Sequence, residues 1–508
     1  MGTFGLRSNS ILPICLTIYS VIVAITEASG TPQVKWISCP KDIPPGVECG
    51  TINVPLKYKG GTSTAGDGSQ TIELFLTRLK STSTGHRQPL FFNPGGPGVP
   101  AAALIADGIY VPNLGFSANV REAFDIVGVD PRGVGHSSPV LCDADIFNQR
   151  VPTFVKNDQD FRKLVYHNRR LGESCRRLSG PIVDNLDVIH TVKDHEVVRQ
   201  ALGATHFNYF GLSYGSLLGQ QYIELYPKKV GRMALDGIVA HSQSETDTLI
   251  TEASTYERTL DKFFEWCDSN STCALHGRNS KKIFDEVLAT ADKKAIPAPG
   301  CAGSCQPNVT GEDIRYNAQD FLEFYDLPVA PNWIDLAGAI AQAHAGNATI
   351  LSTALATNES QGAVEGSPYA YLAIGCQDWR HGASIARQLE GRLSITKRFA
   401  PQTKGASQTY YYQSTCIGWP AKTTNGQRKL HIQSTSRAPP VLLVHSTYDP
   451  SCSPVWAELV AKQLPTSVSI TRDGYGHTSH FLLGETRSVI DLYLATGKLP
   501  RNGAVYKT

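Results

Sequence analysis

The sequence predicts an α/β fold class: a doubly wound, mostly parallel β-sheet with an inserted, mainly helical cap. Three observations predict it. Short apolar runs typical of buried parallel strands recur along the chain. Turns that are rich in glycine or carry charged residues follow several of these runs, which is where an open α/β sheet binds its ligands. Between about residues 241 and 425 the runs give way to helical stretches.

The chain has 508 residues, enough for a large core and more than one domain. We expect a signal peptide at 1–30, the first part of the core at 31–240, the cap at 241–425 and the C-terminal part of the core at 426–508. Near the start, Arg7 precedes a 15-residue apolar stretch at 11–25, which is shorter than the ~20 residues of a transmembrane helix. This pattern indicates a secretory signal cleaved after Gly30, with an uncleaved membrane anchor as the alternative.

The core and the cap differ in their expected elements. Core strands are expected at residues 73–79, 89–92, 125–129, 207–210, 232–235, 441–445 and 467–471. Cap helices are expected at residues 252–266, 281–293 and 318–325. Because the carboxyl ends of parallel strands meet at one edge of a sheet, the turns after these strands are the candidate positions for a functional site.

The pentapeptide at 211–215, Gly-Leu-Ser-Tyr-Gly, is the most specific of these turns. It follows the expected strand at 207–210 and precedes a helical run that stops at Pro227. Strand, G-x-S-x-G and helix together are typical of a nucleophile elbow, in which a strained turn exposes the serine hydroxyl beside a helix N-terminus. The motif alone is a weak signal, but in this context it predicts Ser213 as a nucleophile.

A second turn, Asn-Pro-Gly-Gly-Pro-Gly at 93–98, follows the expected strand at 89–92. A glycine-rich loop can present a backbone N–H to a carbonyl oxygen, and acyl transfer needs two such donors where the oxyanion forms. We expect the N–H groups of Gly96 and Tyr214 to be those donors, because Pro97 has none. Taken alone, the loop is equally typical of an ordinary turn.

The candidate acid and base lie near the C-terminus. Asp449 follows the expected strand at 441–445, and His477 follows a Gly-Tyr-Gly turn 28 residues later. The order Ser…Asp…His is one of the known arrangements of a catalytic triad, in which the imidazole moves the serine proton and the carboxylate orients the imidazole. Four other residues are alternatives for these roles. We expect His480, Asp236 and His445 to be structural, and Asp473 lies too close in sequence to His477 to come from a separate strand end.

The chain resembles the tripeptidyl-aminopeptidase-like branch of secreted α/β-hydrolases, which is related to proline iminopeptidases. The resemblance lies in the segments at 93–98, 130–137, 211–215, 232–237, 373–378 and 416–420 and in those around Asp449 and His477. It implies an α/β-hydrolase fold with Ser213, Asp449 and His477 as nucleophile, acid and base. The chain departs from the family pattern at Cys452, where a small hydroxyl residue is expected, and at Ala240-His241, where an acidic residue and proline are more usual.

The resemblance implies a secreted serine hydrolase, an exopeptidase that acts on peptide N-termini. Such an enzyme needs a carboxylate or carbonyl cluster for the substrate's α-ammonium; Asp378 is the first candidate, and Glu252, Glu323 and Asp326 are others. An esterase or other small-molecule hydrolase is the main alternative, since the fold hosts many substrates. A catalytically silent binding module is a remote one, because no triad residue is missing.

The composition limits the classes of binding partner that we expect for the chain. The net charge of +2 gives no case for nucleic acid or an acidic membrane surface. The motifs and the resemblance imply a peptide or small-molecule acyl substrate, and the oligomeric state is left open. No cofactor and no metal are expected, because no histidine clusters with the cysteines at zinc spacing.

The cysteines and sequons indicate an oxidising, extracellular compartment. Of twelve cysteines, Cys15 lies in the signal segment. The expected disulfides are Cys39–Cys49, Cys142–Cys175, Cys267–Cys273, Cys301–Cys305 and Cys376–Cys416. This leaves Cys452 as the expected free thiol. Glycosylation sequons stand at Asn270, Asn308, Asn347 and Asn358.

Overall fold

The computed structural model describes residues 32–68, 70–85, 87–327, 330–357 and 367–507. The expected signal peptide and the sequon at Asn358 lie outside these residues. From Pro32 onward the chain forms one compact unit.

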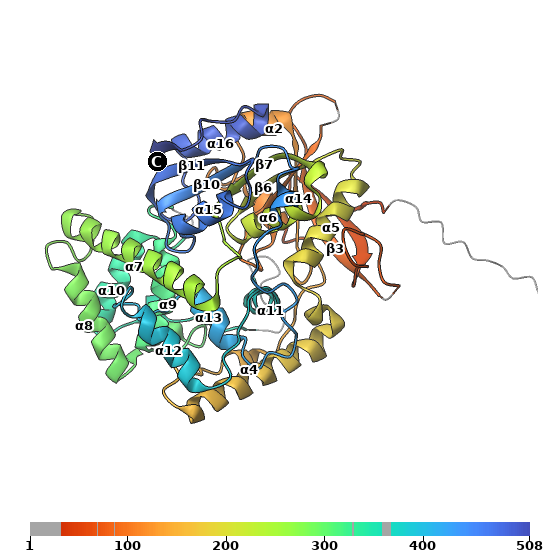
Figure 1. The fold of residues 1–508 in the computed structure, drawn as a ribbon. Coiled ribbons are helices and arrows are strands. Elements are labelled where there is room, and N and C mark those ends of the chain that lie inside the picture. The colour runs from red at the N-terminus through yellow and green to blue at the C-terminus, as the bar shows by residue number, and fades with distance from the viewer. Residues whose placement is uncertain (1–31, 69, 86, 328–329, 358–366, 508) are drawn as a thin grey trace, which may run out of the picture. The chain divides into compact units, whose positions relative to one another are not determined.

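A large, mostly parallel sheet organises this unit (Figure 1). Within the described residues its ten strands lie in the order β1-β2-β3-β5-β4-β6-β7-β10-β11-β12. The strands are β1 (Lys35–Ile37), β2 (Glu48–Pro55), β3 (Thr71–Leu79), β4 (Pro89–Asn93), β5 (Asp125–Val129), β6 (Phe207–Leu212), β7 (Val230–Asp236), β10 (Leu442–Tyr448), β11 (Val468–Tyr475) and β12 (Ala504–Lys507). The pairs from β5 to β12 are parallel, and β1, β2 and β3 form an antiparallel edge that joins β5. The predicted fold class is confirmed.

Helices cover both faces of the sheet because neighbouring strand residues point to opposite sides. Phe91 packs in a core that includes α5 (Val188–Ala201), α6 (Tyr214–Leu225) and α15 (Pro454–Ala461). Phe92 packs in a second core that includes α1 (Ala101–Asp107), α2 (Ala118–Ala123) and α16 (Glu485–Thr496). The central strands β4 and β6 are therefore buried along their whole length rather than on alternate residues, as expected where a sheet is covered on two sides.

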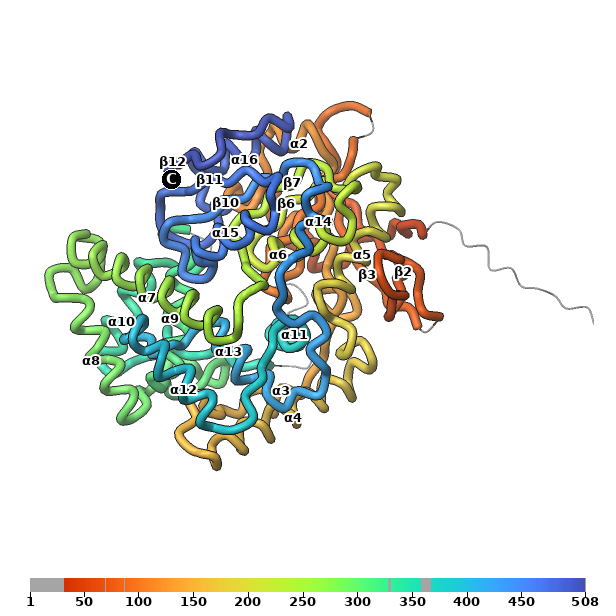
Figure 2. Tube along the Cα trace, in the orientation of Figure 1, coloured from red at the N-terminus to blue at the C-terminus, as the bar shows by residue number. Residues whose placement is uncertain are grey.

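Between β7 and β10 the chain forms a mainly helical region (Figure 2, green to light blue). Its helices are α7 (Glu245–Ser269), α8 (Ser280–Lys293), α9 (Gly311–Leu322), α10 (Trp333–His344), α11 (Pro368–Asp378), α12 (Ala386–Thr396) and α13 (Gln408–Thr415), and it also holds the short strands β8 (Ile296–Pro297) and β9 (Asn308–Val309). Helices α7 to α10 share a hydrophobic core of their own around Phe263, Phe284 and Trp333. We refer to residues 241–425 as the cap.

Two further helices precede the nucleophile strand, α3 (Ala144–Phe147) and α4 (Asp158–Ser179), and α14 (Ile432–Thr435) leads back to the sheet. Helix α4 packs its Phe161 and Leu164 against Leu389 and Leu393 of α12 in the cap. The sequence predicts that this segment belongs to the core. Residues before 240 therefore also contribute to the wall of the cap.

Five disulfides staple the described chain. They are Cys39–Cys49, Cys142–Cys175, Cys267–Cys273, Cys301–Cys305 and Cys376–Cys416, the pairs that spacing suggests. Cys452 has a free, buried thiol. Across the described part of the chain, the structure contains no helix with the length and hydropathy of a membrane span.

Candidate active site

Ser213 lies at the sharp turn between β6 and α6. Its backbone is left-handed, with φ 54° and ψ −122°, a conformation that costs a non-glycine residue of order 1–3 kcal/mol. The turn is held because the Ser213 N–H donates to the Asp236 carbonyl at 2.9 Å, tying it to the neighbouring strand β7. The hydroxyl-bearing residue thus stands at the N-terminus of α6, where the helix dipole favours developing negative charge.

Glycines surround this turn because other backbone passes too close for a side chain. A Cβ at Gly211 would lie 2.5 Å from the Gly215 carbonyl oxygen, and one at Gly215 would lie 2.7 Å from the Asn93 oxygen. At Gly95, with φ +98°, a Cβ would lie 2.8 Å from that of Ser213 and 3.1 Å from the Tyr214 nitrogen. The G-x-S-x-G elbow and the glycine-rich loop are therefore packed against each other.

The two expected oxyanion donors come from these packed segments. The Gly95 N–H donates to the Asn93 side chain at 3.0 Å and so is not free for a substrate. Gly96 lines the same cavity as Ser213. Tyr214 is the first residue of α6, where backbone N–H groups have no partner within the helix. This arrangement favours Gly96 over Gly95 as the second donor beside Tyr214.

The candidate acid and base meet at the carboxyl ends of β10 and β11. The Nδ1 of His477 lies 2.9 Å and 3.0 Å from the two Asp449 carboxylate oxygens. Asp449 is fully buried and also accepts N–H groups of Ser451 (2.9 Å) and Cys452 (2.7 Å), which fix the carboxylate in place. His477 lines the same cavity as Ser213, and so the geometry suits an imidazole oriented by a carboxylate.

Asp236 and His480, the alternatives to Asp449 and His477, contact other parts of the structure. Asp236 is fully buried and accepts N–H groups of Ser479 (2.6 Å) and His480 (3.2 Å), which holds the loop after His477. His480 packs among Phe92, Phe116 and Phe210, and burial lowers its pKa to about 3.

The other two alternatives, His445 and Asp473, also lie where a structural role fits better than a catalytic one. His445 pairs with the Thr471 hydroxyl at 3.1 Å, and Asp473 is exposed on β11.

The electrostatics of His477 predict a pH dependence. Burial alone would lower its pKa, but the charge and hydrogen bond of Asp449, with Glu323 and Asp236 nearby, raise it from 6.5 to about 9. A general base must be neutral, so activity should rise with pH up to about 9, roughly tenfold per unit on the acid side. The rate of serine modification by a fluorophosphonate measures this, since the probe has no titrating group. A rate that stays flat from pH 6.5 to 9 would contradict the assignment.

The site opens into one large cavity of about 1890 Å³. Its catalytic end is lined by Gly96, Ser213 and His477, and its walls come from α4, α9, α11, α12 and α13. The space is larger than the roughly 300–1,000 Å³ of common small-molecule pockets. It can hold an extended chain rather than only a small acyl group.

The structure contradicts Asp378 as a ligand for substrate. This residue ends α11, has no exposed surface and does not line the cavity. Its carboxyl group accepts the Tyr214 hydroxyl at 2.5 Å, the Val188 N–H at 3.1 Å and the Asn425 amide at 3.1 Å. Burial and the neighbouring Asp187 raise its pKa to about 8, which disfavours the carboxylate that an ammonium ion would need. Its role is to anchor the ring of the residue after Ser213.

Of the other acidic candidates, one faces the cavity. Glu323 lines it, whereas Glu252 is buried among the backbone N–H groups of Gln408 and Thr409, and Asp326 does not line it. A second acid, Asp320, lines the same wall and was missed. Its spacing of three residues from Glu323 places both on one helix face, and this was the signal that could have found it.

Asp320 and Glu323 form a negative pair beside the catalytic end. Glu323 accepts the Ser451 hydroxyl at 2.6 Å, and its carbonyl accepts the His477 N–H at 2.6 Å. Asp320 lies deep in the molecule with its side chain open to the cavity; desolvation and the charge of Glu323 raise its pKa to about 7. A cation bound between them would favour the charged form of both.

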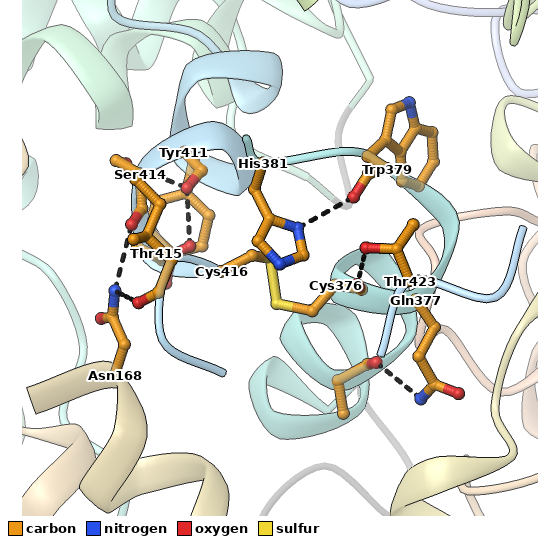
Figure 3. Close-up of a disulfide and its surroundings, with 12 residues drawn as sticks. Asn168, Cys376, Gln377, Trp379, His381, Tyr411, Ser414, Thr415, Cys416 and Thr423 are labelled. Atoms are coloured by element: carbon orange, nitrogen blue, oxygen red, sulfur yellow. Dashed lines mark hydrogen bonds between the residues drawn. A yellow bond between two sulfur atoms is a disulfide. The ribbon is translucent and has the colours of Figure 1, made fainter. Parts of the chain in front are cut away.

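The disulfide Cys376–Cys416 joins α11 to α13, the two helices that supply Tyr371 and Tyr411 to the cavity wall (Figure 3). Asn168 of α4 braces the end of α13 by donating to the carbonyls of Ser414 (3.0 Å) and Ile417 (2.9 Å). The part of the cavity wall that α11 and α13 form is thus fixed covalently and by hydrogen bonds.

Two family models and several known proteins match this chain. A family model described as "alpha/beta hydrolase fold" matches residues 88–299, and one described as "TAP-like protein" matches residues 402–506. The tripeptidyl aminopeptidase of Streptomyces lividans is 29% identical over 92% of this chain and 85% of that protein. Serine protease Hip1 of Mycobacterium tuberculosis is 26% identical over 94% and 89%. Carboxylesterase B of the same species is 27% identical over 92% and 89%.

The chain is therefore an enzyme of the α/β-hydrolase class. Within that class it is a serine hydrolase similar to the tripeptidyl aminopeptidases, as the motifs along the chain predict.

Proposed function

We propose that the chain is a secreted serine exopeptidase that releases short peptides or amino acids from peptide N-termini. The observation that supports this best is the acidic pair Asp320 and Glu323 in the wall of the cavity that also holds Ser213 and His477. A substrate whose α-ammonium binds this pair presents a carbonyl group further along its chain to the nucleophile.

In the proposed mechanism, Ser213 attacks that carbonyl while His477 takes the hydroxyl proton. Asp449 stabilises the imidazolium, and the N–H groups of Gly96 and Tyr214 donate to the oxyanion. His477 then protonates the leaving amine, which departs and leaves an acyl-enzyme on Ser213. Water, activated by the same imidazole, releases the N-terminal fragment and restores the serine.

N-acetylation of a good peptide substrate should lower kcat/KM by about 100-fold or more. Removing the ammonium charge leaves the acidic pair without its partner. In the complex the bound substrate would desolvate this pair, and loss of one member of a desolvated charge pair costs about 2–5 kcal/mol, at about 1.4 kcal/mol per factor of ten. Free and acetylated forms of aminoacyl, dipeptidyl and tripeptidyl chromogenic amides would be compared, which also reports the length released.

The variants Asp320→Asn and Glu323→Gln should reduce this preference for a free N-terminus. Glu312→Gln is the matched control: Glu312 lines the same cavity from the start of helix α9, about 12 Å along the helix axis from Asp320 at 1.5 Å per residue. Equal turnover of free and blocked peptides by the unmodified enzyme would argue against an aminopeptidase.

Hydrolysis of small esters is the second candidate. It is favoured by the relationship to carboxylesterase B, and by the fact that a serine, histidine and aspartate site by itself implies only acyl transfer. An esterase would hydrolyse simple esters well and would be insensitive to substitution of Asp320.

Secretion is supported by the five disulfides and by the apolar segment at 11–25. Asn270, Asn308 and Asn347 are each partly exposed, as N-glycan sites require. Expression in a eukaryotic host should give a mature protein in the medium that begins near Thr31 and loses mass on enzymatic removal of N-glycans. Retention in the cell with residues 1–30 intact would overturn the proposal.

A further inference from the structure

Cys452 lies beside the catalytic residues. It stands three residues after Asp449, and its N–H donates to the Asp449 carboxylate at 2.7 Å, which turns the chain so that the thiol faces inward. The side chain is 2% exposed and forms no disulfide. Cys452 is also one of the two places at which the sequence departs from the pattern of the family that it resembles.

Three ligand groups converge there. One carboxylate oxygen of Asp449, the sulfur of Cys452 and one ring nitrogen of His477 lie within 4.8 Å of one another. Ser213 is close enough to the Cys452 thiol to act on its pKa. Because Ser213 and His477 line the large cavity, a small ion can approach the cluster from it.

The surroundings are negative. Glu252 and Glu323 act on the Cys452 thiol and, with burial and Asp449, raise its pKa well above the usual range. Asp236 acts on His477 from the neighbouring strand. Arg472 offsets part of this charge, and its guanidinium donates to the carbonyls of Tyr475, Gly476 and Thr478 in the loop around His477. A cation would therefore gain electrostatically by binding here.

We propose that Asp449, Cys452 and His477 form an inhibitory site for a thiophilic divalent cation such as Zn²⁺. Sulfur, imidazole nitrogen and carboxylate oxygen are the donors that zinc takes, and Mg²⁺ and Ca²⁺ prefer all-oxygen sites. At bonds of about 2.0–2.3 Å, tetrahedral ligands lie about 3.3–3.8 Å apart, so a small contraction of the cluster closes the site.

Binding involves no oxidation. The S–H bond of Cys452 breaks, a sulfur–zinc bond forms from the sulfur electron pair, and the proton leaves to solvent. The imidazole electron pair that His477 needs as a base, or the Asp449 contact that orients it, is then committed to the metal. The inhibitory effect rests on the proposed roles of His477 and Asp449, whereas the binding itself does not.

Two measurements separate metal binding at this site from inhibition of the enzyme. Cd²⁺ added to the full-length mature protein without reductant should give the ultraviolet charge-transfer band of a Cd²⁺–thiolate bond, and Cys452→Ser should abolish it.

In parallel, Zn²⁺ should slow fluorophosphonate labelling of Ser213, Mg²⁺ at the same concentration should not, and a chelator should restore the rate. For Cys452→Ser and Cys452→Ala, each compared with its own metal-free rate, half-inhibition should need at least about tenfold more Zn²⁺.

His344→Gln is the control for surface zinc binding, because His344 pairs with Glu286 at 3.0 Å on the exposed side of the cap. It should leave the Zn²⁺ response unchanged. A Cd²⁺–thiolate band without inhibition would retain the site and overturn the roles given to His477 and Asp449. Equal half-inhibition of the parent and both Cys452 variants, or no band in the parent, would overturn the site itself.

Discussion

Replacing Ser213 with alanine should abolish turnover, with kcat lower by at least about 10⁴-fold. The hydroxyl is the atom that forms the proposed acyl-enzyme, and no other hydroxyl shares its position at the strained start of α6 in the described structure. Labelling by a fluorophosphonate followed by peptide mass spectrometry measures the same event directly. The label should map to Ser213 and be absent from Ser213→Ala.

The histidines supply a matched comparison for this result. His477→Ala should remove nearly all turnover, whereas His480→Ala should act mainly on stability, because His480 packs among aromatic rings and does not line the cavity. Thermal unfolding of each variant would separate the two effects. If His480→Ala were the crippling change and His477→Ala a mild one, the base would be misassigned.

Asp449→Asn should lower kcat by about 10⁴-fold while leaving the protein folded. The amide keeps the shape of the carboxylate but can no longer stabilise the imidazolium, and it favours the wrong tautomer of His477. The His477 pKa, held at about 9 in part by Asp449, should also fall, so the acid limb of the pH profile should move to lower pH. Fluorophosphonate labelling rates from acid to alkaline pH would show both changes.

Asp236→Asn is the control for this carboxylate. Asp236 is equally buried at the end of the adjacent strand β7, and it bonds the loop at Ser479 and His480 rather than the imidazole. Its replacement should loosen that loop and cost less activity. A larger loss from Asp236→Asn than from Asp449→Asn would reverse the two roles.

Local sequence was sufficient where the chemistry depends on local backbone. The elbow at Ser213 could be predicted because its turn needs a residue with positive φ and glycines where other backbone passes within 3 Å. The strands β4, β6, β10 and β11 were found from apolar runs, which a sheet covered on both faces requires. Closely spaced cysteines gave three of the disulfide pairs for a similar reason, since short loops restrict the possible partners.

The strands at or next to the edges of the sheet have sequence patterns too weak for prediction. Strands β1, β2 and β12 were missed because they lie at or next to the edges of the sheet and mix polar and apolar residues. Helix α9 begins at Gly311, before the predicted start at residue 318, since the capping box of Thr310 and Asp313 sets its first turn.

The sequence by itself determined the class of enzyme, the candidate nucleophile, acid and base, and the covalent framework. Only the tertiary structure decided which acids face the cavity: Asp378 turns into the core to hold Tyr214, and Asp320 and Glu323 turn into the cavity. It also decided that Cys452 lies against Ser213 and His477. The physical reason is the separation along the chain of the residues that determine each feature. Backbone turns and strand patterns follow from neighbouring residues. The surroundings of a carboxylate or thiol depend instead on how the cap and loops, hundreds of residues apart in sequence, pack together.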